Sequence, residues 1–147
     1  MPTLRVLVML PLLLLSREQD PSRERLDASP RHQEWVEVKS GDRPVHCFVV
    51  YPEASAKAPA VIVIHENKGL TDWVRSVADQ LAEAGCIAIA PDLLSGLGPG
   101  GGRTDSFEST DAATKAIYAL DPARVTADLN AVADHVKALP ASSGKLA

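Results

Sequence analysis

The chain has 147 residues, with a hydrophobic share of 46% and a charged share of 23%, which is ordinary for a globular domain with one substantial core. The formal net charge of −4 and the scattered lysines and arginines argue against nucleic acid as a partner. The two cysteines, Cys47 and Cys86, cannot build the disulfide framework of a small secreted domain, and they lack the spacing of a zinc site. We therefore predict no metal and no cofactor.

The N-terminal segment, residues 1–16, resembles a targeting signal. An uncharged apolar run at residues 6–15 follows Arg5. Its length fits the hydrophobic region of a secretory signal and is too short to span a bilayer, which needs about 20 residues. We expect export, to the periplasm in a bacterium, and a cytoplasmic chain if the segment is not functional. The run lacks a small-x-small cleavage pattern after it, so an uncleaved N-terminal anchor stays an alternative and is the sole membrane contact expected.

Residues 17–32 are polar, carry two prolines and show no periodicity, which predicts a linker. The folded domain is predicted to cover residues 33–147. Its first element is a half-buried strand at residues 34–38, where polar and apolar residues alternate. A turn at 41–44 and a second strand at 45–51 complete an antiparallel hairpin at a sheet edge.

The next elements predict a strand–helix–strand unit. Residues 60–64 are a continuous and mostly β-branched run, typical of a strand buried on both faces. Apolar residues at helical spacing then predict a helix with Thr71 as its N-cap and Gly85 at its end. Residues 86–90 form another uniformly apolar strand. Two strands joined through one helix are expected to be parallel, with a right-handed crossover.

The remaining elements are a loop, two helices and the start of a strand. Residues 95–108 predict a long, flexible, glycine-rich loop that matches neither phosphate-binding glycine motif. One helix is predicted over residues 111–120, and another from Asp121, a cap followed by a first-turn proline, to Pro140. Residues 145–147 are interpreted as the start of a buried strand. The fold class is therefore α/β, with a mostly parallel sheet, an N-terminal antiparallel hairpin and flanking helices.

Residues that can carry chemistry follow the most buried strand directly. Open α/β sheets bind ligands beyond the carboxyl ends of their strands. Glu66 is the candidate proton acceptor there; alternatively, it caps the following turn or pairs with Arg75. His65-Glu66 opens like the zinc motif H-E-x-x-H, but the fifth position is Gly69, so no metal site is predicted. The sequence contains no Gly-x-Ser-x-Gly or Gly-x-Cys-x-Gly nucleophile elbow.

Residues 59–94 contain Val-Ile-Val-Ile-His-Glu-Asn-Lys-Gly-Leu, an amphipathic helix, and Ala-Gly-Cys-Ile-Ala-Ile-Ala-Pro-Asp-Leu-Leu. This pattern resembles the dienelactone hydrolase family of α/β-hydrolases. The resemblance implies part of an α/β-hydrolase fold, a small ester or lactone as the substrate and no cofactor. It also implies that the family's nucleophile, histidine and aspartate lie beyond Gly144.

The resemblance assigns roles to single residues. Glu66 would assist activation of a cysteine nucleophile, and the backbone N–H of Asn67 would help to form the oxyanion hole. Family members bind the substrate carboxylate with arginine, for which Arg103 is the candidate and Lys115 the alternative. His65 and Lys68 are candidate substrate contacts because they flank these positions.

We interpret the chain as an ester or lactone hydrolase that stops before its nucleophile and is inactive alone. The alternative is a non-catalytic α/β module that binds a small ligand or complements a separate C-terminal half; a structural or adaptor protein is a third interpretation. In the isolated chain, the strand at 61–64 or at 87–90 is expected to form an unpaired apolar edge, which promotes aggregation.

Overall fold

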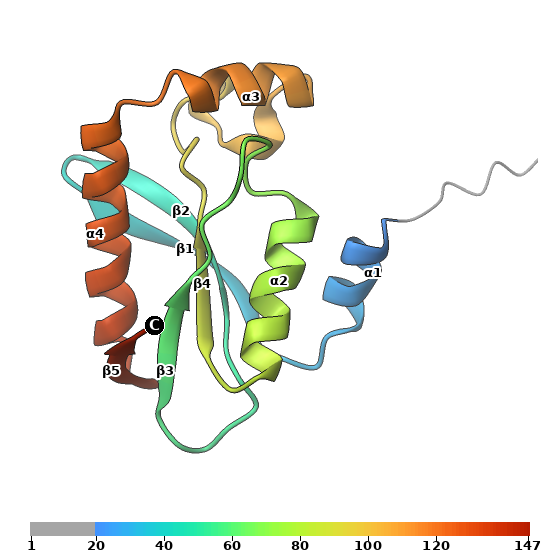
Figure 1. Cartoon of the computed structure of the whole chain (residues 1–147), viewed down its shortest axis with the longest axis vertical. Helices are drawn as coiled ribbons and strands as arrows, with labels where there is room; N and C mark the ends of the chain where they lie inside the picture. The colour runs from blue at the N-terminus through green and yellow to red at the C-terminus, as the bar shows by residue number, and fades with distance from the viewer. Residues whose placement is uncertain (1–19) are drawn as a thin grey trace, which may run out of the picture.

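A five-stranded sheet organises the computed structural model, which describes residues 20–147 (Figure 1). The signal-like segment predicted at residues 1–16 lies outside the described residues. The strand order is β1-β2-β4-β3-β5. The strands are β1 (Gln33–Ser40), β2 (Arg43–Val50), β3 (Ala58–Ile62), β4 (Ile87–Pro91) and β5 (Ser142–Leu146).

Strand directions confirm the predicted hairpin and the predicted strand–helix–strand unit. β2 pairs antiparallel with β1 and with β4, whereas β3 pairs parallel with β4 and with β5. Of the five described strands, therefore, only β2 runs against the others. The carboxyl ends of β3 and β4 meet at one edge of the sheet, where the loops that follow them lie side by side below α3 (Figure 1).

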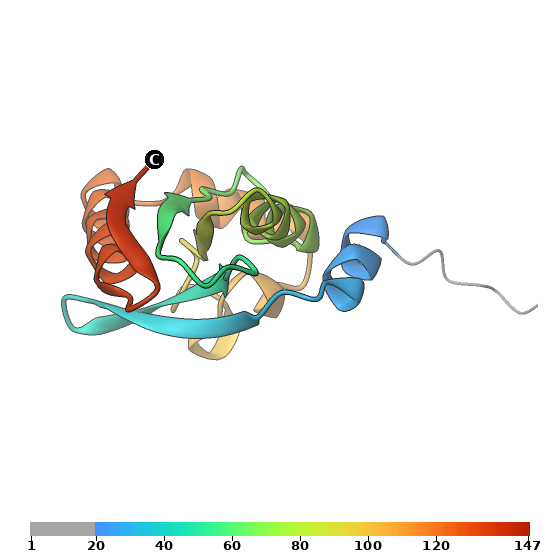
Figure 2. The same cartoon turned by 90° about the horizontal axis from the view of Figure 1, so that it is seen from below.

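Helices cover both faces of the sheet (Figure 2). Alternate residues of β4 belong to two cores: Ile89 packs with Val132 of α4, and its neighbour Ala88 packs with Ala78 of α2. None of the described helices is long and apolar enough to cross a membrane. The helices are α1 (Pro21–Ala28), α2 (Asp72–Glu83), α3 (Thr110–Tyr118) and α4 (Pro122–Ala138).

The helix ends follow their predicted signals closely. Thr71 occupies the N-cap position of α2, although its side chain makes no capping hydrogen bond. Gly85 follows the end of α2 with φ of +97°, a conformation that favours glycine. At α4, the Asp121 carboxylate accepts a hydrogen bond from the N–H of Ala123 at 3.1 Å, and Pro122 occupies the first turn.

The prediction of a linker over residues 17–32 is wrong for its central part, which forms α1. Asp20 caps this helix by accepting from the N–H of Ser22 at 2.9 Å. The helix buries one large apolar side chain, Leu26, which is 6% exposed. One apolar residue produces no periodic pattern, and the contacts that hold α1 are made mainly by charged groups, so no apolar pattern predicts a helix here.

The predicted unpaired edge is wrong for residues 87–90 but not for residues 61–64. β4 lies between β2 and β3, so residues 87–90 are paired on both sides. β5 pairs with β3 only between Ala58 and Ala60, and no strand within residues 20–147 covers the outer side of residues 61–64. The strand predicted at 145–147 does form, as part of β5, but it is not buried: only Ser142 of its five residues is buried, and Leu146 is 41% exposed. The outer edge on this side of the sheet is therefore β5 beside residues 58–60 and the chain of β3 beyond them.

The glycine-rich loop predicted to be flexible has defined backbone hydrogen bonds. The N–H groups of Gly96 and Gly98 both donate to the carbonyl of Gly102, at 2.9 and 3.1 Å. A Cβ atom on Gly98 would lie 2.9 Å from the carbonyl oxygen of Arg103, which no ordinary side chain tolerates. Two short 3₁₀ turns, η1 (Pro99–Gly101) and η2 (Thr104–Ser106), shape the loop.

Candidate active site

The side chain of His65 connects the segments that follow β3 and β4 through hydrogen bonds to their backbone. Its ring is 7% exposed, and its Nε2 accepts the N–H of Leu93 at 3.1 Å. Nε2 therefore carries no proton, so Nδ1 carries it and donates to the carbonyl oxygen of Glu66 at 2.8 Å. Because the backbone uses both ring nitrogens, this geometry argues against the predicted contact between His65 and a substrate. His65 instead fixes the backbone at Glu66.

Glu66 and Asn67 leave two polar groups free at the end of this segment. The Glu66 side chain is exposed and makes no hydrogen bond or ion pair within residues 20–147, since Arg75, its predicted alternative partner, pairs with Asp72. The carbonyl of Asn67 accepts the hydroxyl of Thr114 of α3 at 2.9 Å, whereas the Asn67 N–H donates to no group in the described part of the chain. One carboxylate and one N–H are thus available to a ligand.

A buried carboxylate joins the loop after β3 to the loop after β4. Asp92 is buried and accepts the N–H of Leu94 at 3.0 Å, the N–H of Thr104 at 3.0 Å and the hydroxyl of Thr104 at 2.8 Å. The same hydroxyl oxygen accepts the N–H of Leu70 at 3.0 Å. Gly69 lies against it with φ of +82°, and a Cβ atom there would be 2.6 Å from Cγ2 of Thr104. The two loops therefore form one unit.

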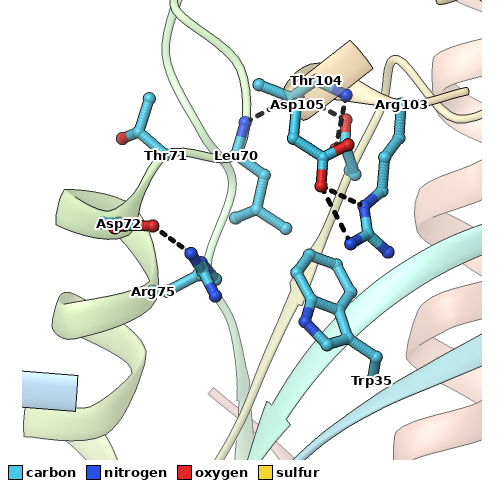
Figure 3. A pocket seen from close by; sticks show the side chains of 9 residues that line it. Trp35, Leu70, Thr71, Asp72, Arg75, Arg103, Thr104 and Asp105 are labelled. Atoms are coloured by element: carbon cyan, nitrogen blue, oxygen red, sulfur yellow. Dashed lines mark hydrogen bonds and ion pairs between the residues drawn. The ribbon is translucent and has the colours of Figure 1, made fainter. Parts of the chain in front are cut away.

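Two guanidinium groups border a cavity of about 230 Å³, which we call the arginine cavity (Figure 3). Arg103 lies over the ring of Trp35, 3.7 Å from its centroid, and pairs with Asp105 at 3.0 Å. Arg75 of α2 lies 5.6 Å from the same centroid. The full lining consists of Trp35, Leu70, Thr71, Asp72, Arg75, Asp92, Arg103, Thr104 and Asp105.

A second cavity, of about 420 Å³, lies on the other side of Thr71 and is called the α1 cavity. It brings together the predicted residues Glu66 and Lys68, whereas Arg103 lies in the arginine cavity. Thr71 borders both. The full lining of the α1 cavity consists of Asp20, Ser22, Glu66, Lys68, Thr71 and Trp73.

Neither cysteine is placed to act at this site. Cys47 is buried in β2, and burial, together with the charges of Asp92 and Asp128, raises the pKa of its thiol to about 12. Its thiolate, the nucleophilic form, is therefore scarce near neutral pH. Cys86 precedes β4 and lies at the opposite end of the sheet. Within residues 20–147, no three His, Cys, Asp or Glu side chains gather in a way that could hold a metal ion.

Three residues of the site were not identified from the sequence. Asp92 follows β4 directly, so the rule about strand carboxyl ends that pointed to Glu66 also applies to it. Trp35 and Arg75 are far from Arg103 in the sequence and carry no local motif. They meet only because β1, α2 and the loop after β4 come together in the fold (Figure 3).

Comparison with known proteins identifies the same region of the chain. The model of the dienelactone hydrolase family matches residues 45–147. The carboxymethylenebutenolidase of Pseudomonas putida is 27% identical over 114 residues, which cover 77% of this chain and 48% of that protein. A protein of Escherichia coli (strain K12) described as a hydrolase fragment, YghX, is 45% identical over 67 residues, which cover 45% of this chain and 57% of that protein.

Solved structures share the fold. The dienelactone hydrolase-like promiscuous phosphotriesterase P91 from metagenomic libraries has a TM-score of 0.62 at 24% identity, over 79% of this chain and 47% of that one. The dienelactone hydrolase from Anabaena variabilis ATCC 29413 has a TM-score of 0.53 at 17% identity, over 79% of this chain and 50% of that one. The chain thus spans about half the length of these two structures.

Proposed function

Because this chain belongs to the dienelactone hydrolase family, we propose that it carries the oxyanion-binding and acid–base part of a site that hydrolyses a small ester or lactone. One observation carries the proposal: the Asn67 N–H and the Glu66 carboxylate are both free, and both follow β3 at the edge where α/β sheets bind ligands.

The two free groups have complementary chemical roles. An ester carbonyl that is attacked by a nucleophile develops negative charge on its oxygen, and the Asn67 N–H is the donor for that oxygen. Loss of one such donor lowers rates in comparable enzymes by about 10²–10³-fold. The Glu66 carboxylate accepts a proton and so favours the ionised form of the nucleophile. The hydrogen bond from His65 to the Glu66 carbonyl supports both groups by holding the backbone between them.

The nucleophile comes from outside these residues in this proposal. Residues 1–147 contain no nucleophile elbow, and the Cys47 thiol is buried with a raised pKa. The chain alone is therefore expected to be inactive. A polypeptide corresponding to the second half of the P. putida relative would pair with the exposed edge of β5 and supply the missing groups.

The test is hydrolysis of p-nitrophenyl acetate by the chain alone and after co-expression with that second half. We expect activity only in the complex, and loss of it with Glu66→Ala. Glu53→Ala is the matched control, because Glu53 is also exposed but lies in the loop before β3, at the other end of the sheet. A complex that forms and is active with Glu66→Ala would contradict the role of Glu66.

The role of Asn67 has its own test in the same complex. Asn67→Ala keeps the backbone N–H and is expected to retain activity, whereas Asn67→Pro removes the donor and is expected to lose it. Equal activity of the two variants would show that this N–H does not stabilise the transition state. Circular dichroism of both variants checks that the fold is unchanged.

A second candidate function is ligand binding without chemistry. It is favoured by the arginine cavity, where Arg75 and Arg103 lie near one aromatic ring although no nucleophile elbow is present in the chain. Calorimetric titration of the isolated chain with maleate tests it. Binding that Arg103→Gln weakens, in a chain that gains no activity from the second half, would favour the binding module over the hydrolase.

We further propose that residues 1–16 direct export. A fusion of residues 1–32 to a reporter that is active only outside the cytoplasm tests this, and Leu12→Arg and Leu14→Arg, which interrupt the apolar run, serve as the control. Equal reporter activity with and without the substitutions would contradict export.

A further inference from the structure

The helix α1 precedes the region matched by the family model, yet its first turn lies at the candidate site. We infer that α1 is a docked wall of the α1 cavity, locked in place by the buried carboxylate of Asp79, and that it limits which substrate groups can lie beside Glu66. The inference deepens the proposed function, because it concerns the selectivity of the same site.

The carboxylate of Asp79 lies on α2, and its hydrogen-bond and ion-pair partners lie in α1 or just after it. Asp79 is 0% exposed, and Arg31 binds both of its oxygens, through Nε at 2.9 Å and Nη2 at 2.8 Å. The Ser29 hydroxyl donates to it at 2.5 Å, and Nε of Arg25 lies 3.3 Å away. A bidentate pair of this kind fixes orientation as well as distance.

Separating Asp79 from its partners is expected to cost a large free energy. A buried carboxylate that loses its partners remains as an uncompensated charge, which is strongly destabilising. Burial alone would raise the pKa of Asp79, but the hydrogen bonds from Arg31 and Ser29 and the charges of Arg31 and Arg25 outweigh it and lower the pKa. The carboxyl is therefore ionised near neutral pH, when both arginines are charged. Three charged groups would have to be separated to release α1.

Other contacts fix the direction of α1. Leu26 is buried among Phe48, Val74 and Ala78, in the core between α2 and the sheet. Nη2 of Arg25 also binds Glu83 at 2.5 Å, toward the end of α2. These contacts hold the C-terminal half of α1 and so carry its N-terminal end toward the start of α2.

The N-terminal end of α1 is the part that reaches the site. Asp20 and Ser22 line the α1 cavity together with Glu66, Lys68 and Trp73, and Trp73 is 57% exposed. Without α1, the groups around Glu66 would open to solvent on this side. With α1 docked, a substrate group beside Glu66 must share the cavity with the side chains of Asp20 and Ser22, so these two are specificity-determining residues.

Trp73 offers a test that does not depend on hydrolysis. The chain has two tryptophans, so Trp35→Phe leaves Trp73 as the single emitter, and acrylamide quenching then measures access to the α1 cavity. In this background, Ser22→Phe should lower the quenching constant, because the ring fills the cavity. Glu24→Phe, at an exposed position of α1 outside the cavity lining, should leave it unchanged.

The lock is tested in the same background. Asp79→Asn should raise quenching of Trp73 and speed tryptic cleavage after Arg23 or Arg25 by at least about tenfold, since cleavage follows the population of the undocked helix. Asp128→Asn is the matched control, because Asp128 is equally buried and paired with Arg43, but it lies on α4 on the other face of the sheet.

Equal quenching constants for Ser22→Phe and Glu24→Phe would contradict the claim that α1 forms a wall of the α1 cavity. Equal cleavage rates for Asp79→Asn and Asp128→Asn would contradict the claim that Asp79 holds α1 in place. If Asp79→Asn does not fold, Ser22→Phe and Glu24→Phe still test whether α1 forms a wall of the cavity. Ser29→Ala, which removes one hydrogen bond to the same carboxylate, then tests whether Asp79 holds α1 in place. Failure of the hydrolysis tests would leave these results unaffected, so the two proposals fail separately.

Discussion

The hydroxyl of Thr104 donates to the buried carboxylate of Asp92 at 2.8 Å, and the Thr104 N–H donates to it at 3.0 Å. Because the hydroxyl oxygen also accepts the N–H of Leu70, one side chain connects the loop that carries Arg103 to the loop that carries Glu66. The relative position of the two cavities depends on this pair.

Thr104→Val tests the pair with a substitution that keeps the shape of the side chain. It leaves the Leu70 N–H without its partner and removes one of the hydrogen bonds to Asp92. We expect the free energy of unfolding, measured in urea, to fall by about 1–3 kcal/mol. Thr126→Val is the control, since its hydroxyl bonds only to the carbonyl of Pro122 on the exposed side of α4. An equal loss in both variants would contradict the connecting role of Thr104.

Gly69→Ala is expected to destabilise the same region. Gly69 has φ of +82°, and a Cβ atom would lie 2.6 Å from Cγ2 of Thr104, so both the backbone and the space oppose a side chain. Gly41 also has a positive φ, of +60°, but nothing lies within 4 Å of its added Cβ. Thermal unfolding should therefore show a loss for Gly69→Ala that exceeds that for Gly41→Ala by about 1 kcal/mol or more. Equal losses would show that the contact with Thr104 has no energetic importance.

Local patterns predicted the elements of the sheet, because strand burial and helix capping act over a few residues. Thr71, Gly85 and Asp121 lie where their roles at helix ends require. Glu66 could be placed at the candidate site because the end of a buried parallel strand is a position defined by the sequence itself. Asn67 was indicated only by the resemblance to the dienelactone hydrolase family, and the roles of both residues stay predictions. Two predictions that were wrong are the linker over residues 17–32 and the burial of the last strand, and both are decided by contacts between distant segments.

Those failures have a common physical cause. α1 is stabilised by the pairing of Arg31 with Asp79, 48 residues away, which has no periodic signature. Both ring nitrogens of His65 bond to backbone groups of Leu93 and Glu66, which argues against the predicted substrate contact and which its place in the sequence does not reveal. Pairing of β5 with β3 likewise depends on a chain crossing that residues 145–147 do not encode.

The stabilisation from Asp79 should depend on pH. Its folded pKa is below its ordinary value of about 3.9, so its contribution is present above that value and is lost as the pH falls through the folded pKa. The difference in unfolding free energy between the chain and Asp79→Asn should be constant near neutral pH and shrink below about pH 4. A difference that persists unchanged in strong acid would contradict the ionised, paired state of Asp79.

The cysteines should differ in reactivity. Burial raises the pKa of the Cys47 thiol to about 12, whereas Cys86 is partly exposed. Iodoacetamide should therefore label one site in the folded chain and two in urea, as counted by mass spectrometry. Cys86→Ser should abolish labelling of the folded chain. Rapid labelling of Cys47 in that variant would show that β2 opens more readily than its burial implies.

The outer edge formed by β5 should govern self-association of the isolated chain. Leu146 is 41% exposed on this edge strand, whose outer backbone groups have no partner within residues 20–147. Leu146→Lys is expected to reduce association, as measured by sedimentation velocity, because a charge on an edge strand opposes pairing with another chain. Tyr118→Lys is the control, since Tyr118 is an exposed apolar residue on α3, away from the sheet edge. Equal effects of both substitutions would indicate association through general surface hydrophobicity.

The docking of α1 fixes the position of its N-cap residue on the molecule. Asp20 both caps α1 and lines the α1 cavity together with Glu66, so the backbone at residue 20 is fixed at that cavity. A purification tag or a fused protein joined at residue 20 would therefore start beside the carboxylate that we propose as the proton acceptor. Assays of the chain should carry any tag elsewhere.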